Sequence, residues 1–308
     1  MEIALQFVLL ALGFVMLGKG ADWFVEGAAG IAMRFGIPQL VIGLTIVAMG
    51  TSAPEAAVSI AAAVKGNADI TIGNIVGSNI LNILVILGLA ASIVPIAVAR
   101  STVRIEIPFM IGVTALLFYQ GRDGSISLAD GGVLMVAFAA YMMYLYTMAM
   151  KSNVDSDLEE PGLPLGLCLL GAVGGLALII AGSNVTVGAA TSIATYAGLS
   201  ERFIGLTIVA LGTSLPELFT SVAAARRGNA DIAIGNIVGS NIFNILFVVG
   251  LSSLIIDIPF ASAFNFDTYV ALGAAVLLWL CVLRTQRLQR WAGALMLVCY
   301  AAYLGYIL

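Results

Sequence analysis

Two glutamates lie inside long apolar stretches of the chain, each at the end of the same short motif. The motif Gly-Thr-Ser-x-Pro-Glu occupies residues 50–55 and 212–217, so the glutamates are Glu55 and Glu217. In a bilayer, a carboxylate at the centre costs at least about 2.5–3.5 kcal/mol on insertion scales, and two would also repel each other. Protonation would remove that cost, and so would a cation bound between them. The pair therefore indicates a site for a proton or a metal cation.

Hydroxyl groups accompany each glutamate at helical spacing. The threonine and serine of the motif precede the glutamate by four and three residues, which puts all three side chains on one helical face. These hydroxyls belong to Thr51 and Ser52 in the first motif and to Thr213 and Ser214 in the second. The proline of each motif also frees the backbone carbonyl four residues before it, at Gly50 and Gly212. In lipid, such a carbonyl needs protein, water or an ion as its partner.

A second duplicated motif, Gly-Asn-Ile-Val-Gly-Ser-Asn-Ile-x-Asn, adds neutral oxygens at 73–82 and 235–244. Its glycines are four residues apart, a spacing that lets helices approach closely in a membrane. Its serine and last asparagine are the better ligand candidates: Ser78 and Asn82 in the first copy, Ser240 and Asn244 in the second. The intervening Asn79 and Asn241 are assigned instead to hydrogen bonds between helices.

All of these donors are oxygen atoms. The chain contains no histidine, and its three cysteines lie in apolar runs without close spacing, which excludes imidazole and thiolate sites. Oxygen-only donors suit hard cations, and calcium takes roughly 6–8 oxygens at about 2.3–2.6 Å in flexible geometry. Two carboxylates balance one Ca²⁺ or a set of Na⁺ ions. If the two kinds of ion occupied the site in turn, exchange would follow directly, so the residues themselves indicate cation transport.

The duplication extends beyond the motifs. Residues 43–82 and 205–244 are identical at 30 of 40 positions, at a constant offset of 162. The chain is therefore two copies of a unit of about five spans, which we assign to 1–150 and 163–308 with an acidic linker at 151–162. Because five is odd, the second copy enters the membrane from the opposite face. This arrangement gives inverted repeats with a shared site near the midplane.

The composition indicates a membrane protein. Of 308 residues, 61% are hydrophobic and only 10% are charged, whereas soluble domains carry about 25% charged residues. The predicted fold class is therefore an all-α polytopic membrane protein with about ten transmembrane helices. The apolar segments that we assign as spans are 3–33, 38–64, 70–94, 102–119, 128–150, 163–195, 203–225, 231–256, 267–283 and 291–307.

Lysines and arginines are distributed unevenly over the predicted loops. With both termini outside, nine of them fall in inner loops and three in outer loops, which is a clear positive-inside bias. We therefore expect a multi-pass protein of the cell membrane with both termini outside and the linker 151–162 in the cytoplasm. A net charge of −4 without a large basic cluster argues against nucleic acid as a partner. Beyond the lipid bilayer, no obligatory protein partner is evident from the sequence.

The first span carries three charges that the second copy lacks. Lys19, Asp22 and Glu26 correspond to Ala181, Asn184 and Gly188 at the offset of 162. Charges present in only one copy do not fit a symmetric transport site. We interpret them as part of an interfacial ion pair on a long, tilted helix.

The two motif-bearing blocks resemble the paired alpha-repeats of the cation/calcium exchanger superfamily, most closely the prokaryotic sodium/calcium exchangers. The similarity runs over essentially all ten spans. It implies electrogenic exchange of several Na⁺ for one Ca²⁺ by alternating access, with the first and sixth spans as a sliding pair. Glu55 and Glu217 would bridge the calcium and sodium sites. The other ligands implied are hydroxyls and backbone carbonyls, at Thr51, Thr213, Ser52, Ser214, Ser78, Ser240, Ala48 and Ala210.

One position departs from the pattern of some relatives. Where an exchanger can carry an acid at the end of the second repeat's motif, this chain has Asn244, which matches Asn82. The substitution leaves the charge of the site at −2 and argues against dependence on potassium.

A calcium/proton exchanger is the main alternative, because Glu55 and Glu217 could take protons in place of Na⁺. An intramembrane enzyme would need an Asp-rich diphosphate motif, a His-Glu-x-x-His motif or a Gly-x-Ser-x-Gly turn, and the sequence contains none of them. A passive cation channel is the third possibility, and it would support no uphill flux of one ion driven by another. We therefore expect a transporter and not an enzyme, without a prosthetic group, whose transported ions are Ca²⁺ and Na⁺.

Overall fold

The computed structural model describes residues 2–152, 163–198 and 210–307. Most of the predicted acidic linker, from residue 153 on, lies outside these residues, as does the start of the predicted span 203–225. The described residues are mainly helical, with four strands of two residues each.

The first half of the chain forms one long helix, a broken span and three further spans. Its elements are α1 (Glu2–Arg34), α2 (Gln39–Ile42), the π-helix η1 (Gly43–Val47), α3 (Ala48–Thr51), α4 (Ala53–Val64), α5 (Asp69–Leu81), the π-helix η2 (Asn82–Leu87), α6 (Gly88–Ile93), β1 (Ile96–Ala97), the π-helix η3 (Thr102–Glu106), α7 (Ile107–Gln120), the 3₁₀ turn η4 (Gly121–Asp123), β2 (Ser125–Ile126) and α8 (Leu128–Ser152).

The described part of the second half follows a similar order, without counterparts of η3 and η4. Its described elements are α9 (Leu165–Tyr196), α11 (Ala210–Thr213), α12 (Leu215–Arg226), α13 (Ala230–Phe243), the π-helix η6 (Asn244–Val249), α14 (Gly250–Ile255), β3 (Ile258–Pro259), α15 (Ala263–Leu283), β4 (Arg287–Leu288) and α16 (Arg290–Ile307). In both halves a π-helix begins at the last asparagine of the second duplicated motif.

Eight helices in the described residues are long and apolar enough to cross a membrane, and a ninth span results if the pair Gln39–Thr51 and Ala53–Val64, bent by 51°, is counted as one. The predicted boundaries agree within a few residues except at α15, which begins at Ala263. The predicted start at 267 is four residues late. The carboxylate of Asp267, in the second turn of α15, accepts a hydrogen bond of 2.9 Å from the Tyr303 hydroxyl of α16.

Two short antiparallel ribbons join the halves. β1 pairs with β4, with Ile96 opposite Leu288, and β2 pairs with β3, with Ile126 opposite Ile258. The offset of 162 converts Ile96 into Ile258 and Ile126 into Leu288. The two ribbons are therefore the same contact made twice, once from each half, as inverted repeats about a pseudo-two-fold axis require.

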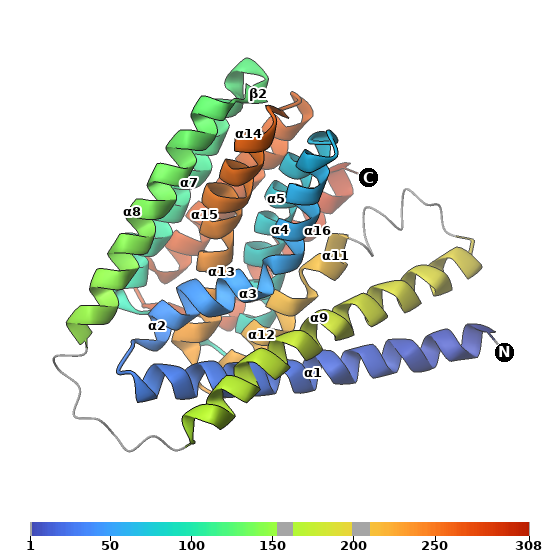
Figure 1. Ribbon diagram of the computed structural model, residues 1–308, viewed down its shortest axis with the longest axis vertical. Helices are drawn as coiled ribbons and strands as arrows, with labels where there is room; N and C mark the ends of the chain where they lie inside the picture. Colours follow the sequence, from blue (N-terminus) through green and yellow to red (C-terminus); the bar gives the residue numbers. More distant parts are fainter. Residues whose placement is uncertain (1, 153–162, 199–209, 308) are drawn as a thin grey trace.

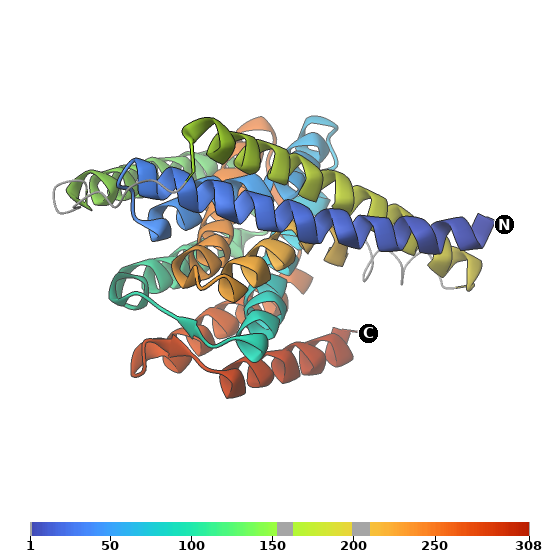
Figure 2. The ribbon, with the colours of Figure 1, turned by 90° about the horizontal axis from the view of Figure 1, so that it is seen from below.

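α1 and α9 lie side by side as a long pair set at an angle to most of the other helices (Figures 1 and 2). Glycines recur every seven residues along α1, at Gly13, Gly20 and Gly27. A Cβ atom at Gly20 would lie 2.9 Å from the carbonyl oxygen of Gly175 in α9, which is too close for any residue but glycine. The pair is therefore held by close backbone packing, as small residues allow between membrane helices.

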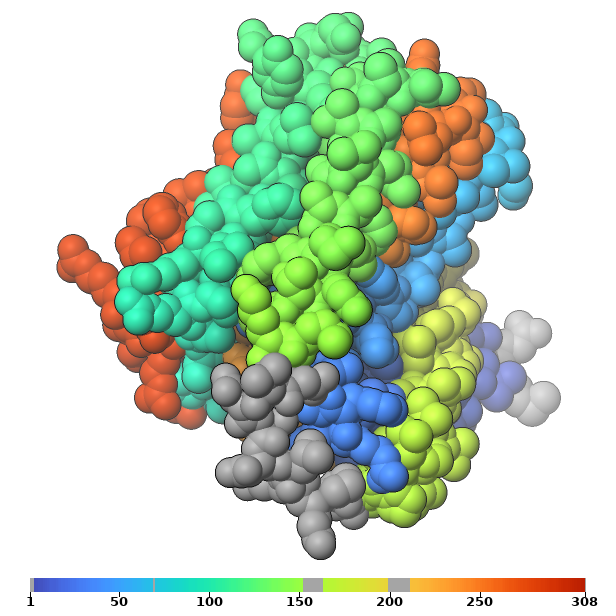
Figure 3. Space-filling view, turned by 60° about the vertical axis from the view of Figure 1, so that its left-hand side comes forward, coloured from blue at the N-terminus to red at the C-terminus, as the bar shows by residue number. Residues whose placement is uncertain are grey.

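The interior and the surface of the remaining helices differ in the expected way. α13 is buried along its whole length from Ile232 to Phe243. α8 forms the outer surface in the space-filling view (light green, Figure 3), and Val136 and Met143 on it are largely exposed. Exposed apolar side chains on an outer helix suit contact with lipid, while the buried α5 and α13 are the elements that can present polar groups to a central site.

Candidate functional site

Both motif glutamates stand in the first turn of a helix that follows a break in the chain. Ser52 separates α3 from α4 with φ −82° and ψ 5°, and Ser214 separates α11 from α12 with φ −91° and ψ 2°. Pro54 and Pro216 occupy the first turn after each break, where a proline lacks no needed hydrogen bond. A helix N-terminus carries partial positive charge, so each break places its carboxylate where negative charge is stabilised.

The two breaks face each other across the halves of the molecule. The Ser52 hydroxyl donates a hydrogen bond of 2.8 Å to Oε1 of Glu217, and the Ser214 hydroxyl donates one of 3.4 Å to Oε1 of Glu55. Each serine thus reaches the glutamate of the other copy. Both glutamates are 1% exposed, so the carboxylates share one enclosed site.

The motif threonines belong to the same site. The hydroxyls of Thr51 and Thr213 interact with the carboxylates of Glu217 and Glu55 respectively, again from the opposite copy. Thr51 is fully buried and its hydroxyl also donates to Oδ1 of Asn236 at 3.0 Å, whereas Thr213 is partly exposed. The two copies supply the same groups, but in surroundings that are not identical.

Asparagines of the second motif hold the backbone of the breaks. Nδ2 of Asn74 donates to the carbonyl oxygen of Glu55 at 3.3 Å and to the Ser59 hydroxyl at 2.9 Å. Asn236 makes the equivalent bonds to Glu217 at 3.4 Å and to Ser221 at 2.9 Å. Ser59 and Ser221 were not among the predicted site residues. Their identity at corresponding positions of the two copies was the available signal.

Four further asparagine side chains form a cluster between α5 and α13. Asn79 and Asn241 each donate to the other's backbone carbonyl at 3.2 Å, which confirms their predicted role in joining helices. Nδ2 of Asn82 donates to Oδ1 of Asn241 at 2.9 Å, and Nδ2 of Asn244 donates to Oδ1 of Asn79 at 3.1 Å. The amide oxygens of Asn82 and Asn244 take no part in these hydrogen bonds.

The remaining predicted ligands lie nearby. Ser78 and Ser240 are buried in α5 and α13, and the Ser240 hydroxyl lies 3.3 Å from the carbonyl oxygen of Ala48, to which it donates. That carbonyl also accepts the Ser52 amide at 3.0 Å. Its counterpart Ala210 is the first residue of α11.

One carbonyl that a proline was expected to free has a protein partner. The carbonyl oxygen of Gly212 accepts a hydrogen bond of 2.7 Å from the hydroxyl of Ser183 in α9. The prediction that such a group needs a partner is met there by a side chain of the long helix pair. Ser183 corresponds to Ala21 in the first copy, so no signal in the repeat pointed to it.

Four buried oxygen atoms of this site have no hydrogen-bond partner among the described residues: Oε2 of Glu55, Oε2 of Glu217, Oδ1 of Asn82 and Oδ1 of Asn244. They form two pairs, and in each pair one atom comes from the first copy and the corresponding atom comes from the second copy. A buried carboxylate or amide oxygen without a partner costs free energy, about 1–3 kcal/mol and more when charged. Oxygen atoms of this kind are the ligands that a hard cation takes.

The composition of the site restricts what it can hold. Among the described residues, no group of three or more His, Cys, Asp and Glu side chains is placed to hold a metal ion. The donor set is instead two carboxylates with neutral hydroxyl and amide oxygens. Few charges and many neutral oxygens suit an ion that must be released as well as bound.

Known proteins resemble this chain over nearly its whole length. The family model described as "Sodium/calcium exchanger protein" matches residues 5–147 and 167–308. The putative antiporter CaxA of Alkalimonas amylolytica is 40% identical over 314 residues, 98% of each chain. The sodium/calcium exchanger MaX1 of Methanosarcina acetivorans is 33% identical, again over 98% of each chain. A solved structure of the sodium-calcium exchanger NCX_Mj, soaked with Na⁺ and Sr²⁺, is 34% identical with a TM-score of 0.86, covering 98% of this chain and 99% of that one.

Proposed function

The chain belongs to the sodium/calcium exchanger protein family, and from this premise we propose that it is a secondary active antiporter that exchanges Na⁺ for Ca²⁺. In this role it is a multi-pass membrane transporter whose cargo is the two ions, and it needs no prosthetic group. The ions would bind in turn at one site between the two inverted halves, which opens to one membrane face and then to the other.

The observation that carries the proposal is the set of four unpartnered oxygens. Oε2 of Glu55 and Glu217 and Oδ1 of Asn82 and Asn244 are buried and come equally from both halves. Ca²⁺ would neutralise both carboxylates and take oxygens from each half. Na⁺ ions would neutralise the same carboxylates one at a time, so the two ions compete for the same charge.

The proposed ligand set comprises the following groups. Glu55 and Glu217 supply charge; the hydroxyls of Thr51, Thr213, Ser52, Ser214, Ser78 and Ser240, the amide oxygens of Asn82 and Asn244, and the carbonyls of Ala48 and Ala210 supply neutral oxygens. Hydroxyl rotors adapt to ions of different charge at little cost, because their hydrogen can turn away from a cation. This adaptability supports one site serving both Na⁺ and Ca²⁺.

The moving parts follow from the packing. α1 and α9 pack against each other through glycines. The Ser183 hydroxyl of α9 donates a hydrogen bond to the carbonyl of Gly212 beside the second break. A shift of the pair would therefore alter the surroundings of one break directly. We propose that 1–150 and 163–308 are the two repeats, that 151–162 is a cytoplasmic linker, and that both termini lie outside, from the distribution of Lys and Arg.

Transport driven by a gradient tests the proposal. Purified protein is reconstituted into liposomes loaded with Na⁺, and uptake of ⁴⁵Ca²⁺ is measured after dilution into Na⁺-free buffer at the same pH on both sides. We expect accumulation of Ca²⁺ above its equilibrium level that disappears when choline replaces the internal Na⁺. Accumulation driven by an internal acid load without Na⁺ would assign the protein to proton-coupled exchange instead. Equilibration without accumulation under either gradient would indicate a channel.

A further inference from the structure

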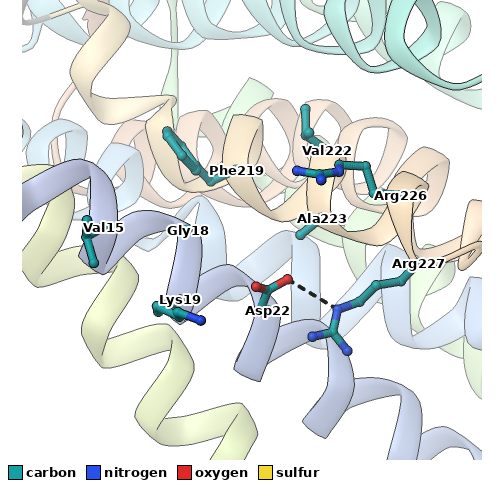
Figure 4. A pocket seen from close by; sticks show the side chains of 9 residues that line it. All are labelled: Val15, Gly18, Lys19, Asp22, Phe219, Val222, Ala223, Arg226 and Arg227. Atoms are coloured by element: carbon teal, nitrogen blue, oxygen red, sulfur yellow. Dashed lines mark hydrogen bonds and ion pairs between the residues drawn. The ribbon is translucent and has the colours of Figure 1, made fainter. Parts of the chain in front are cut away.

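A pocket of about 560 Å³ lies between α1 and α12, away from the central site. Figure 4 shows its lining: Lys19 and Asp22 approach from α1, and Arg226 and Arg227 approach from the end of α12. Arg226 is the last residue of α12, and the chain turns at Gly228 with φ +80°. Because the predicted span 203–225 ends here, we infer that the charged end of the pocket lies near a membrane surface.

The positive charge of this pocket exceeds its negative charge. Arg227 forms ion pairs with Asp22 at 3.3 Å and with Glu26 at 3.2 Å, so the two acids of the first span are paired as predicted, with an arginine of the other half, while Lys19 takes no part. Lys19 and Arg226 form no ion pair within the described part of the chain. Both acids are engaged with Arg227, so two cationic groups remain to meet an anion.

The pocket changes from charged to apolar along its length. Val15 and Phe219 lie at the end away from Arg227 (Figure 4). From Arg226 to Phe219 is seven residues of helix, or about 10 Å towards the membrane interior. A ligand that fits this gradient has an anionic group at the surface and an apolar tail directed inward. A phospholipid has that form, whereas a free inorganic anion uses only the charged end.

The charges are not part of the common architecture of the repeats. Lys19, Asp22, Glu26 and Arg226 correspond to Ala181, Asn184, Gly188 and Val64 in the other copy. The halves agree around the central site, yet these four charges occur in only one half. Folding of the repeat therefore does not require them, and the set of charges between α1 and α12 has no equivalent in the other half.

We propose that this pocket binds the headgroup of an anionic phospholipid, with the phosphate between Lys19 and Arg226 and an acyl chain along Val15 and Phe219. Basic pockets between membrane helices bind anionic headgroups because lysine and arginine form charge-assisted hydrogen bonds with phosphate. The bound lipid bridges α1, one of the long pair, and α12, which carries Glu217. The lipid thus connects the long helix pair to the helix that carries a glutamate of the central site. This inference rests on the pocket and is independent of the transported ion.

Lipid binding to the intact protein tests the proposal. Full-length protein in mild detergent is titrated with dioleoylphosphatidylglycerol, and bound lipid is counted by native mass spectrometry, with dioleoylphosphatidylcholine as the neutral comparison. Each basic side chain near an anionic lipid contributes about 1 kcal/mol, so the double variant Lys19→Gln/Arg226→Gln should bind phosphatidylglycerol about 30-fold more weakly. The matched control is Lys65→Gln, at the position equivalent to Arg227 in the other copy, which should bind as wild type does.

The possible outcomes separate the proposal from its competitors. Loss of phosphatidylglycerol binding in the double variant alone, with an unchanged unfolding temperature, supports it. Should the double variant fail to fold, the two single variants should each weaken binding about five-fold. Equal binding of the two lipids, equal loss in Lys65→Gln, or displacement of the lipid by millimolar inorganic phosphate would overturn it, the last by assigning the pocket to free anions.

Discussion

Around the central site the two halves of the molecule carry the same side chains, whereas beside the long helix pair they do not. Glu55 and Glu217, with the serines that reach them, are related by the offset of 162 and make reciprocal contacts. The pocket between α1 and α12 contains Lys19 and Arg226, for which the other half has alanine and valine. The side chains that contribute to the shared site therefore match between the halves, whereas those of the pocket do not.

The central site itself is not fully symmetric. The Ser52–Glu217 hydrogen bond is 2.8 Å long and the Ser214–Glu55 bond is 3.4 Å, and Thr51 is buried where Thr213 is partly exposed. Alternating access requires that the two halves have different conformations at any moment and exchange them during the cycle. The same residues in slightly different surroundings are what this scheme requires. The difference between the regions can therefore be tested by substitution of matched residues.

The largest effect is expected at the glutamates. Glu55→Gln or Glu217→Gln removes one of the two charges that would balance Ca²⁺, and we expect a loss of exchange on the order of 100-fold, about 3 kcal/mol of binding. Sodium-driven ⁴⁵Ca²⁺ uptake in liposomes measures it. The matched control is Glu26→Gln, a glutamate of α1 that lies outside the site and is paired with Arg227. Wild-type uptake in one of these two variants would rule out the substituted glutamate as a ligand.

The next effect concerns the seam of the helix pair. Gly20→Ala places a Cβ atom 2.9 Å from the carbonyl oxygen of Gly175, so α1 and α9 must separate. Overpacking of this kind costs typically about 1–3 kcal/mol, and we expect a lower unfolding temperature and slower exchange. Gly18→Ala is the control two residues away, because its Cβ would have no atom within 4 Å. Equal behaviour of the two variants would show that the seam tolerates separation.

A smaller effect should distinguish the two serines. Ser52→Ala removes the 2.8 Å hydrogen bond to Glu217, and Ser214→Ala removes the 3.4 Å bond to Glu55. A hydrogen bond to a charged group contributes about 1.5–3 kcal/mol, and a long bond contributes less. The unfolding temperature of the ion-free protein, measured by differential scanning calorimetry, should therefore fall further in Ser52→Ala. Identical losses would show that the difference between the two bond lengths has no energetic consequence in solution.

The smallest effect is expected at the ion pairs of the long helix. Arg227→Ala removes the contacts with Asp22 and Glu26, which are solvent-accessible and contribute at most about 1 kcal/mol each. The fall in unfolding temperature should be small and should vanish in high salt, because screening weakens exposed charges. Lys65→Ala, at the equivalent position of the other copy, should leave stability unchanged at any salt concentration.

The sequence predicted the site better than it predicted the surroundings of the site. The duplicated motifs identified Glu55 and Glu217 because two intramembrane acids at matching positions need a shared explanation. Ser183 could not be predicted in this way. Its partner, the carbonyl of Gly212, is a backbone group that becomes available only because the helix is interrupted at Ser214. Similarly, an ion pair on the first span was predicted. Its cation, Arg227, could not be predicted because the contact with Asp22 and Glu26 depends on how α1 packs against α12.

The central claim is that Na⁺ and Ca²⁺ use the same two carboxylates, and equilibrium binding tests it most directly. Ca²⁺ binding to the purified protein is measured by calorimetry at graded Na⁺ concentrations, with choline holding the ionic strength constant. Sharing of the site predicts that the apparent Kd for Ca²⁺ rises with more than the first power of the Na⁺ concentration, and linkage requires Ca²⁺ to weaken Na⁺ binding reciprocally. Calcium affinity that is unaffected by Na⁺ but falls with acid would contradict the claim and assign the carboxylates to proton exchange.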